Sequence, residues 1–282
     1  MTAALGEPGI RSRASRLGVD KRPVRDRRVD VCGVGIDALT KRDVIAIIEA
    51  RLDEPTGLSI SVVNVAKLVA MRNDRLLRES VLSGDLILAD GMPLVWLARV
   101  LRRPLPERVA GIDLMFELLR LADRRGLRVF FLGAKPDVLQ QTVAVARQEY
   151  PGLVLAGSHH GYFADADGDN IAGLIRRSRP DILLVAMSSP KKELFLSRYG
   201  PGLAAGVCHG VGGSFDVMAG VTRRAPRWMQ SIGMEWFYRL LQEPRRMWRR
   251  YLTTNLLFFF MAAREILCAR VKAGNGNESG AA

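Results

Sequence analysis

The chain is poor in cysteine and histidine, with three of each in 282 residues. Cys32, Cys208 and Cys268 stand far apart, and their spacing matches neither a disulfide framework nor a zinc site. Scattered thiols of this kind are typical of a protein from a reducing cytoplasm. The sequence therefore favours neither a secreted disulfide-rich scaffold nor a structural zinc site, and we expect no metal centre.

Long hydrophobic runs are also missing. The longest, Leu256–Ala263 (LLFFFMAA), is much shorter than the roughly 20 residues that cross a bilayer as a helix. The basic N-terminus contains no apolar core of the kind found in a secretory signal. From the sequence alone we expect neither a transmembrane segment nor a secretory leader.

Acidic residues are scarce at the two ends of the chain, where the net charge of +13 is concentrated. Residues 1–28 carry eight Lys/Arg against three acids, and residues 223–250 carry eight Arg against two acids. The stretch 29–222 is close to neutral. Basic ends bind an anionic partner, which can be nucleic acid, anionic lipid or a phosphorylated substrate. Because no nucleic-acid-binding motif accompanies the charge, nucleic acid is the least favoured of the three.

The stretch between the basic ends alternates apolar strand-like segments with helical patterns. This order predicts an α/β domain over residues 29–222, with a Rossmann-like parallel sheet covered by helices on both faces. Residues 29–37 are expected to form a strand, and residues 67–82 a helical stretch. Thr40 is expected to cap the helix that follows the first strand.

The two ends are predicted to be separate from this domain. Residues 1–28 lack any periodicity and are expected to form a flexible basic tail. Residues 223–272 hold three of the four tryptophans, and they predict two helices broken at Pro244. Arginines beside Trp, Tyr and Phe on an amphipathic helix are typical of a membrane-associating appendage. A surface helix packed on the domain is the plainer alternative. Residues 273–282 are expected to be a disordered tail.

Asp90 and Arg108 are the strongest candidates for a site. Asp90 follows the apolar stretch LILA, and Arg108 stands 18 positions later in a loop. Ligands of parallel sheets bind at the carboxyl ends of the strands. An acid there suits a catalytic base, and an arginine suits a negatively charged leaving group. By composition alone, a turn residue and a surface ion pair remain the simpler interpretations.

Two glycine-rich turns are weaker candidates. Gly133 ends the stretch VFFLG, and Gly212 lies in HGVGGSFD together with Asp216. Glycine lets a ligand approach the backbone, and helix amides beyond the turn can bind phosphate. Neither turn is a P-loop, and no complete dinucleotide fingerprint is present, so a dehydrogenase is disfavoured. The acidic stretch Asp165–Asp169 lacks the spacing of a calcium loop, and we interpret it as a solvated loop.

Several short motifs occur in a fixed order and together resemble the WecG/TagA/CpsF family of bacterial glycosyltransferases. These are SVVNVAKLV, LADGMPLVW, ERVAGIDL, VFFLGAKP, HHGYF, SSPKKELFL, GVGGSFDVMAG and RRAPRWMQ. The resemblance covers residues from about 31 to about 251. It implies an inverting enzyme that moves a sugar of the N-acetylmannosamine or uronic-acid class from a UDP-sugar to a polyprenyl-diphosphate-linked acceptor. It also implies that neither a metal nor another cofactor is needed, and that the product belongs to exopolysaccharide or cell-wall glycan.

The resemblance also assigns roles to residues. It makes Asp90 the general base, and it places Arg108 and Asn64 in the pocket and Asp216 near the nucleotide. The arginines of the appendage are implied to close over the site and reach the diphosphate at the membrane. They are Arg239, Arg246 and Arg249.

This chain departs from the family pattern at two positions. Val62 stands where the family often has Thr, which removes a hydroxyl unless Ser61 replaces it. Lys192 stands where the family commonly has a substrate-contacting Gln. A lysine there favours a more anionic donor or acceptor, such as one with a uronic acid or an extra phosphate.

The resemblance implies a cytoplasmic protein that is peripheral on the inner face of the cell membrane, where its anionic surface binds the appendage. A homo-oligomer is left open. The alternative function is a UDP-sugar-binding scaffold or sensor without transferase activity, for which Val62 and Lys192 are the only hints.

Overall fold

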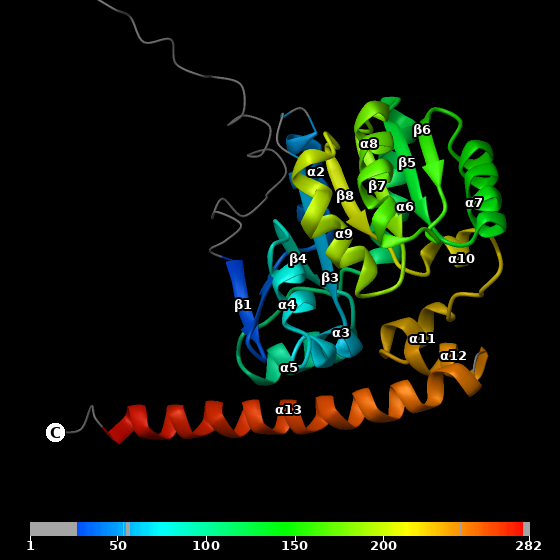
Figure 1. The fold of residues 1–282 in the computed structure, drawn as a ribbon. Coiled ribbons are helices and arrows are strands. Elements are labelled where there is room, and N and C mark those ends of the chain that lie inside the picture. Colours follow the sequence, from blue (N-terminus) through cyan, green and yellow to red (C-terminus); the bar gives the residue numbers. More distant parts are fainter. Residues whose placement is uncertain (1–26, 53, 55–56, 243, 279–282) are drawn as a thin grey trace, which may run out of the picture.

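The computed structural model describes residues 27–278, with gaps at residues 53, 55–56 and 243. Its centre is a six-stranded sheet in the order β4-β3-β8-β7-β5-β6, in which every neighbouring pair is parallel (Figure 1). The predicted α/β parallel sheet is therefore confirmed. Its strands are β3 (Leu58–Val63), β4 (Leu86–Ala89), β5 (Arg128–Gly133), β6 (Val154–His159), β7 (Ile182–Ala186) and β8 (Val207–Gly210).

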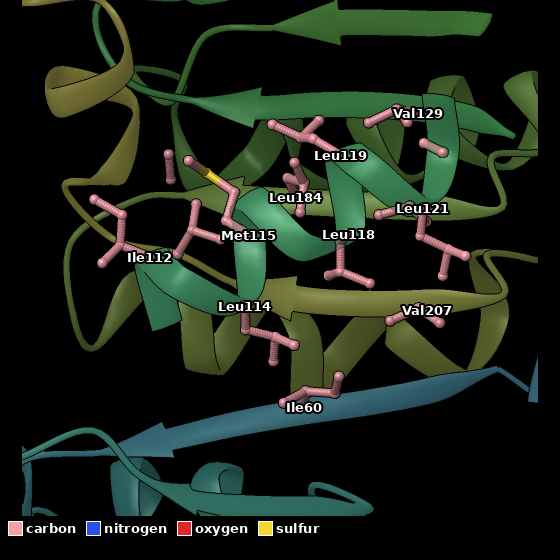
Figure 2. Close-up of a cluster of buried hydrophobic side chains, with 14 of the residues drawn as sticks. Ile60, Ile112, Leu114, Met115, Leu118, Leu119, Leu121, Val129, Leu184 and Val207 are labelled. Carbon is pink, nitrogen blue, oxygen red and sulfur yellow. The ribbon is translucent and has the colours of Figure 1, made fainter. Parts of the chain in front are cut away.

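One face of the sheet is covered by α2 (Lys41–Arg51), α6 (Gly111–Arg125), α7 (Pro136–Glu149) and α10 (Ser214–Met218). Helix α6 lies across its middle, and Leu114, Met115 and Leu118 pack against the strands (Figure 2). The central strands β7 and β8 are buried along their whole length, because helices cover the sheet on both sides.

The opposite face is covered in two halves. Helices α8 (Gly168–Ser178) and α9 (Lys191–Tyr199) pack on β5, β7 and β8. Helices α3 (Val65–Ala70), α4 (Arg75–Leu82) and α5 (Met92–Val100) pack near β3 and β4. Successive side chains of a strand point to opposite faces of the sheet. Ile87 and Leu88 of β4 therefore belong to different hydrophobic clusters.

Residues 29–37 do not form a single strand. They fold into the antiparallel hairpin of β1 (Arg28–Val31) and β2 (Val34–Asp37), a sheet of its own. Cys32 and Gly33 connect the strands, and both have positive φ, as a two-residue hairpin turn with the right twist requires. The sequence lacks the usual Asn-Gly or Asp-Gly signal, which is why the turn was missed.

The helical stretch 67–82 is likewise divided into α3 and α4. Asp74 begins α4 as its N-cap, accepting a hydrogen bond from the amide of Leu77 at 2.8 Å. Elsewhere a predicted cap is confirmed: Thr40 forms a capping box with Asp43 at the start of α2.

The appendage consists of three helices rather than two. They are α11 (Arg227–Ser231), α12 (Glu235–Gln242) and α13 (Pro244–Glu278), so the predicted break at Pro244 is confirmed and α11 was missed. The strand arrows point toward the side on which these helices lie (Figure 1). Helix α13 then runs back along the domain and contacts α3, with Met261 buried in the cluster around β4.

The expectation of a disordered C-terminal tail needs correction. Helix α13 extends to Glu278, so most of the stretch 273–282 is helical rather than a disordered tail; residues 279–282 lie outside the described residues. By length and composition, Leu252–Ala269 could also cross a membrane, although no single apolar run within it is long. The predicted N-terminal tail over residues 1–28 lies outside the described residues up to residue 26, and β1 begins at Arg28.

Candidate active site

The carboxyl ends of β4, β3 and β8 lie side by side, and each is followed by a polar or flexible turn. Asp90 follows β4, Asn64 follows β3, and Gly210 ends β8. The amide of Asp90 donates to the carbonyl of Val63 at 2.8 Å, which continues the parallel pairing past the strand ends. The sheet therefore fixes Asp90 and Asn64 as neighbours, as their position after apolar strands predicts.

Asp90 is partly buried and sits at the N-terminus of α6. Its Oδ1 accepts a hydrogen bond from the amide of Gly111 at 3.1 Å. Desolvation raises the pKa of Asp90 above its usual range, and nearby Glu235 raises it further. The Gly111 hydrogen bond and the positive charges of Arg108 and Lys67 act in the opposite direction. A carboxylate with a raised pKa is a stronger base than an exposed one, which suits proton abstraction.

Arg108 reaches the site from the loop before α6. Its Nη1 pairs with Glu235 of α12 at 2.8 Å, and its Nη2 lies 3.8 Å from Asp113 of α6. Arg224 binds Asp113 in a bidentate manner, with N–O distances of 2.6 and 2.9 Å. Two arginines and two carboxylates therefore join the appendage to the sheet domain beside Asp90. Sequence reasoning missed Glu235, although it is one of only two acids among the arginines of residues 223–250.

Asn64 has a structural task as well as a candidate binding role. Its Oδ1 accepts a hydrogen bond from the amide of Lys67 at 3.0 Å and caps α3. Capping fixes the orientation of the side chain, and it engages only the carbonyl oxygen. The amide nitrogen is the group with which Asn64 could contact a ligand.

His209 lies beneath the site and is completely buried. Its Nε2 is 2.9 Å from the carbonyl oxygen of Gly111, the residue whose amide binds Asp90. Burial lowers the pKa of His209 to about 4, so the ring is neutral at neutral pH and can donate from Nε2. His209 thus helps to hold Gly111, whose amide orients the carboxylate, and sequence reasoning missed this role. The signal was a histidine at the end of an apolar strand.

Lys192 forms part of a buried ion cluster. Its Nζ lies 2.9 Å from Glu193 Oε1, and Lys67 Nζ lies 2.8 Å from the same oxygen. Two cations share one carboxylate, and burial together with Lys192 lowers the pKa of Lys67 to about 8. The same cations hold the pKa of Glu193 at about 2, against the effect of its burial. The side chain of Lys192 is only 10% exposed, so it acts on the site through its buried positive charge rather than through direct contact with a ligand.

The glycine-rich turns differ in what their glycines permit. A side chain at Gly133 would meet the carbonyl oxygen of Ala186 on β7, so close packing of the two strands accounts for this glycine. Gly133 also lies four strand spacings from β4, or roughly 20 Å. Gly212 has φ of +56° with open space where a side chain would be, and Asp216 lies in the first turn of α10. The turn after β8 is therefore the better placed of the two for a ligand.

The arginines of the appendage are divided between two helices. Arg239 lies on α12, one turn after Glu235, and is partly exposed. Arg246 and Arg249 lie in the first turns of α13, but their side chains are outside the described residues. Only the helix positions of these two residues therefore bear on the site.

Asp165–Asp169 follows β6, at the opposite end of the sheet from β4, in a largely exposed turn that begins α8. Within the described part of the chain, no three His, Cys, Asp or Glu side chains are grouped as metal ligands. The positive charge at the candidate site comes from guanidinium and ammonium groups.

Most of this chain is similar in sequence to known proteins. The model of the glycosyl transferase WecG/TagA/CpsF family matches residues 29–272. An N-acetylglucosaminyldiphosphoundecaprenol N-acetyl-beta-D-mannosaminyltransferase of Bacillus subtilis is 38% identical over 202 residues, which are 72% of this chain and 78% of the relative. A protein of the same name from Bacillus spizizenii is 40% identical over 185 residues, which are 65% of this chain and 70% of the relative.

Proposed function

The chain belongs to the WecG/TagA/CpsF family of glycosyltransferases, and we propose that it transfers an N-acetylmannosamine-class or uronic-acid sugar from a UDP-sugar to a polyprenyl-diphosphate-linked acceptor. The observation that carries the proposal is the placement of Asp90 beside Arg108 at the carboxyl edge of the sheet. The relatives' names specify an acceptor of this kind and an N-acetylmannosaminyl group.

The reaction is a single displacement at the anomeric carbon of the donor sugar. Asp90 takes the proton from the acceptor hydroxyl as its oxygen attacks, and the bond between the anomeric carbon and the UDP oxygen breaks. The departing diphosphate develops negative charge, which Arg108 stabilises through paired hydrogen bonds. Attack from the side opposite to the leaving group inverts the anomeric centre.

The transfer is proposed to need no metal or other cofactor. Leaving-group stabilisation requires positive charge, and arginine supplies it in a geometry that matches phosphate oxygens. Arg108 and Arg224 bring two guanidinium groups to this edge, and Arg239 lies on the nearby helix α12. Turnover in the presence of a chelator tests whether a metal is needed.

The enzyme is proposed to work on the cytoplasmic face of the membrane as a peripheral protein. Support comes from the lipid-linked acceptor and from α13, where Trp248, Leu252, Leu256, Phe259 and Phe260 are all exposed. The opposite face of α13 packs on the domain through Met261 and its neighbours, which argues against lipid on all sides of the helix. A helix with one packed and one apolar exposed face suits the interface of a membrane.

A UDP-release assay tests the function directly. The purified chain is incubated with UDP-N-acetylmannosamine and a synthetic N-acetylglucosaminyl-diphosphate-lipid, with and without EDTA, and compared with UDP-N-acetylglucosamine and the corresponding UDP-uronic acid. We expect release that depends on the acceptor and is unaffected by EDTA. UDP binding without transfer to any acceptor would instead support the scaffold or sensor.

A further inference from the structure

Glu235 is hydrogen-bonded to the guanidinium group of Arg108, which the proposed reaction needs for the diphosphate. It is the first residue of α12, 127 positions from Arg108 in the sequence, and its Oε2 lies 2.8 Å from Arg108 Nη1. Both side chains are largely shielded from solvent, at 13% exposure for Arg108 and 22% for Glu235. A shielded contact of this length is a charge-assisted hydrogen bond rather than a loose surface pair.

The neighbouring charges make Glu235 the main counterion of Arg108. Asp113 lies 3.8 Å from Arg108, but it is engaged in the two short bonds to Arg224. Glu235 is also 3.8 Å from Arg224 Nε. Without the charge of Glu235, Arg108 would share Asp113 with Arg224.

A carboxylate and a phosphate use the same hydrogen bonds on arginine. Asp90 already lies close enough to Glu235 for the two negative charges to act on each other. A diphosphate at Arg108 would bring a third anionic group into this space, and like charges at such distances repel. The carboxylate of Glu235 and the leaving diphosphate are therefore competitors for Arg108.

We propose that Glu235 is a built-in anionic ligand of Arg108, which the diphosphate of the donor displaces when it binds. The exchange couples the donor site to the appendage, because the displaced residue begins α12 and Arg239 lies one turn further on the same face of that helix. In the empty enzyme Glu235 holds Arg108 in place; in the donor complex it releases Arg108. The inference rests on the proposed UDP-sugar function.

The test is UDP binding to the full chain by titration calorimetry. Glu235→Gln keeps the size of the side chain and removes its charge, so UDP should bind roughly three- to tenfold more tightly than to the wild type. Uridine, which has no phosphates, should bind both proteins equally. Glu79→Gln removes one negative charge from a surface pair with Arg75 and should leave UDP affinity unchanged.

The outcomes separate the two proposals. Unchanged or weaker UDP binding by Glu235→Gln, with the wild type binding UDP normally, overturns the displacement of Glu235 and leaves the transferase proposal standing. A wild type that binds no UDP overturns both. Glu235→Asp keeps the charge but shortens the reach to Arg108, so its affinity for UDP should lie between those of the wild type and Glu235→Gln. If Glu235→Gln does not fold, Glu235→Asp takes its place in the test. In that case, an affinity of Glu235→Asp equal to that of the wild type would overturn the inference.

Discussion

Asp90 combines a candidate catalytic role with an unfavourable environment for its charge. Burial is the main cause that raises the pKa of Asp90 in the folded protein. At pH values between the usual carboxyl pKa and this raised pKa, Asp90 is protonated in the folded protein and ionised in the unfolded chain. Stability therefore falls as the pH rises through this window. Wherever the side chain is ionised, its buried charge reduces the stability of the fold.

Asp90→Asn should consequently lower activity and raise stability together. Loss of the general base should reduce turnover by roughly a hundredfold or more, while Asn can still accept the hydrogen bond from Gly111. The melting temperature at pH 7 should rise by about a few degrees. Turnover in the UDP-release assay and thermal melts test the two effects. Near-normal turnover would remove Asp90 from the role of base.

Lys192 has a testable effect on donor choice. The cluster with Glu193 and Lys67 holds two cations against one carboxylate, and Lys192→Gln would leave a balanced pair. If the extra positive charge favours an anionic donor, the variant should lose activity with a UDP-uronic acid relative to UDP-N-acetylmannosamine, by about tenfold or less. Turnover across the donors measures this, with Lys191→Gln as a control for the same charge change. An unchanged donor ranking contradicts the idea.

The sequence singled out Asp90 and Arg108 as candidates, by a position after an apolar strand and a position in a loop, and the family resemblance added Asn64. It could not predict the partners that determine their charge state. Glu235 meets Arg108 across 127 positions, and His209 meets Gly111 across 98. Such contacts depend on how the chain folds back on itself, and no local spacing encodes them.

At the scale of elements, β8 and α6 are joined by the bond from His209 to Gly111. The pKa of His209 is about 4 in the folded protein, whereas an ordinary histidine has a pKa near 6.5. Between pH 4 and 6.5 the unfolded chain therefore binds a proton at His209 that the folded protein excludes. The contribution of His209 to stability should therefore be complete above about pH 6.5 and should be lost as the pH drops towards 4. The full effect is roughly 3 kcal/mol.

His209→Gln should flatten this pH dependence. The glutamine amide can still donate to Gly111, but it does not titrate, so denaturant unfolding should show a smaller loss of stability between pH 6.5 and 4. The effect of Glu193 lies lower, because its pKa of about 2 places its titration below the usual Glu range. An unaltered slope in the variant would show that His209 does not set the acid stability.

The helices and strands illustrate where local patterns fail. The capping box at Thr40 is a local motif and was predicted, whereas the break between α3 and α4 follows from the cap at Asp74, a common residue inside helical patterns. The hairpin of β1 and β2 was missed because the Cys32–Gly33 turn lacks its usual residues. Hydrophobic periodicity identifies helices and strands, but the residues at caps and turns determine where each one ends.

At the scale of the whole molecule, the basic appendage is wrapped along the domain instead of extending from it. The sequence predicted two of its three helices and the break at Pro244, but the return of α13 over α3 follows from burial of Met261 and its neighbours. This packing leaves an apolar face outward, which includes Phe259 and Phe260 at 67% and 60% exposure. Two adjacent exposed phenylalanines are the part of α13 best suited to enter a lipid interface.

Phe259→Ser with Phe260→Ser should weaken binding to anionic vesicles without unfolding the protein. Each phenylalanine removed from the lipid side loses about 1 kcal/mol or more of apolar burial, so partitioning should fall at least about tenfold. Vesicle sedimentation measures the loss, with thermal melts confirming an intact fold. Phe258→Ser is the matched control, because Phe258 packs on the cluster around Met261 and its loss should lower the melting temperature instead. Equal partitioning of the double variant and the wild type would exclude this face from the membrane contact.

Extraction at high pH tests whether α13 lies on the membrane or crosses it. A peripheral protein is released from membranes by this treatment, whereas a protein with a spanning Leu252–Ala269 helix is retained.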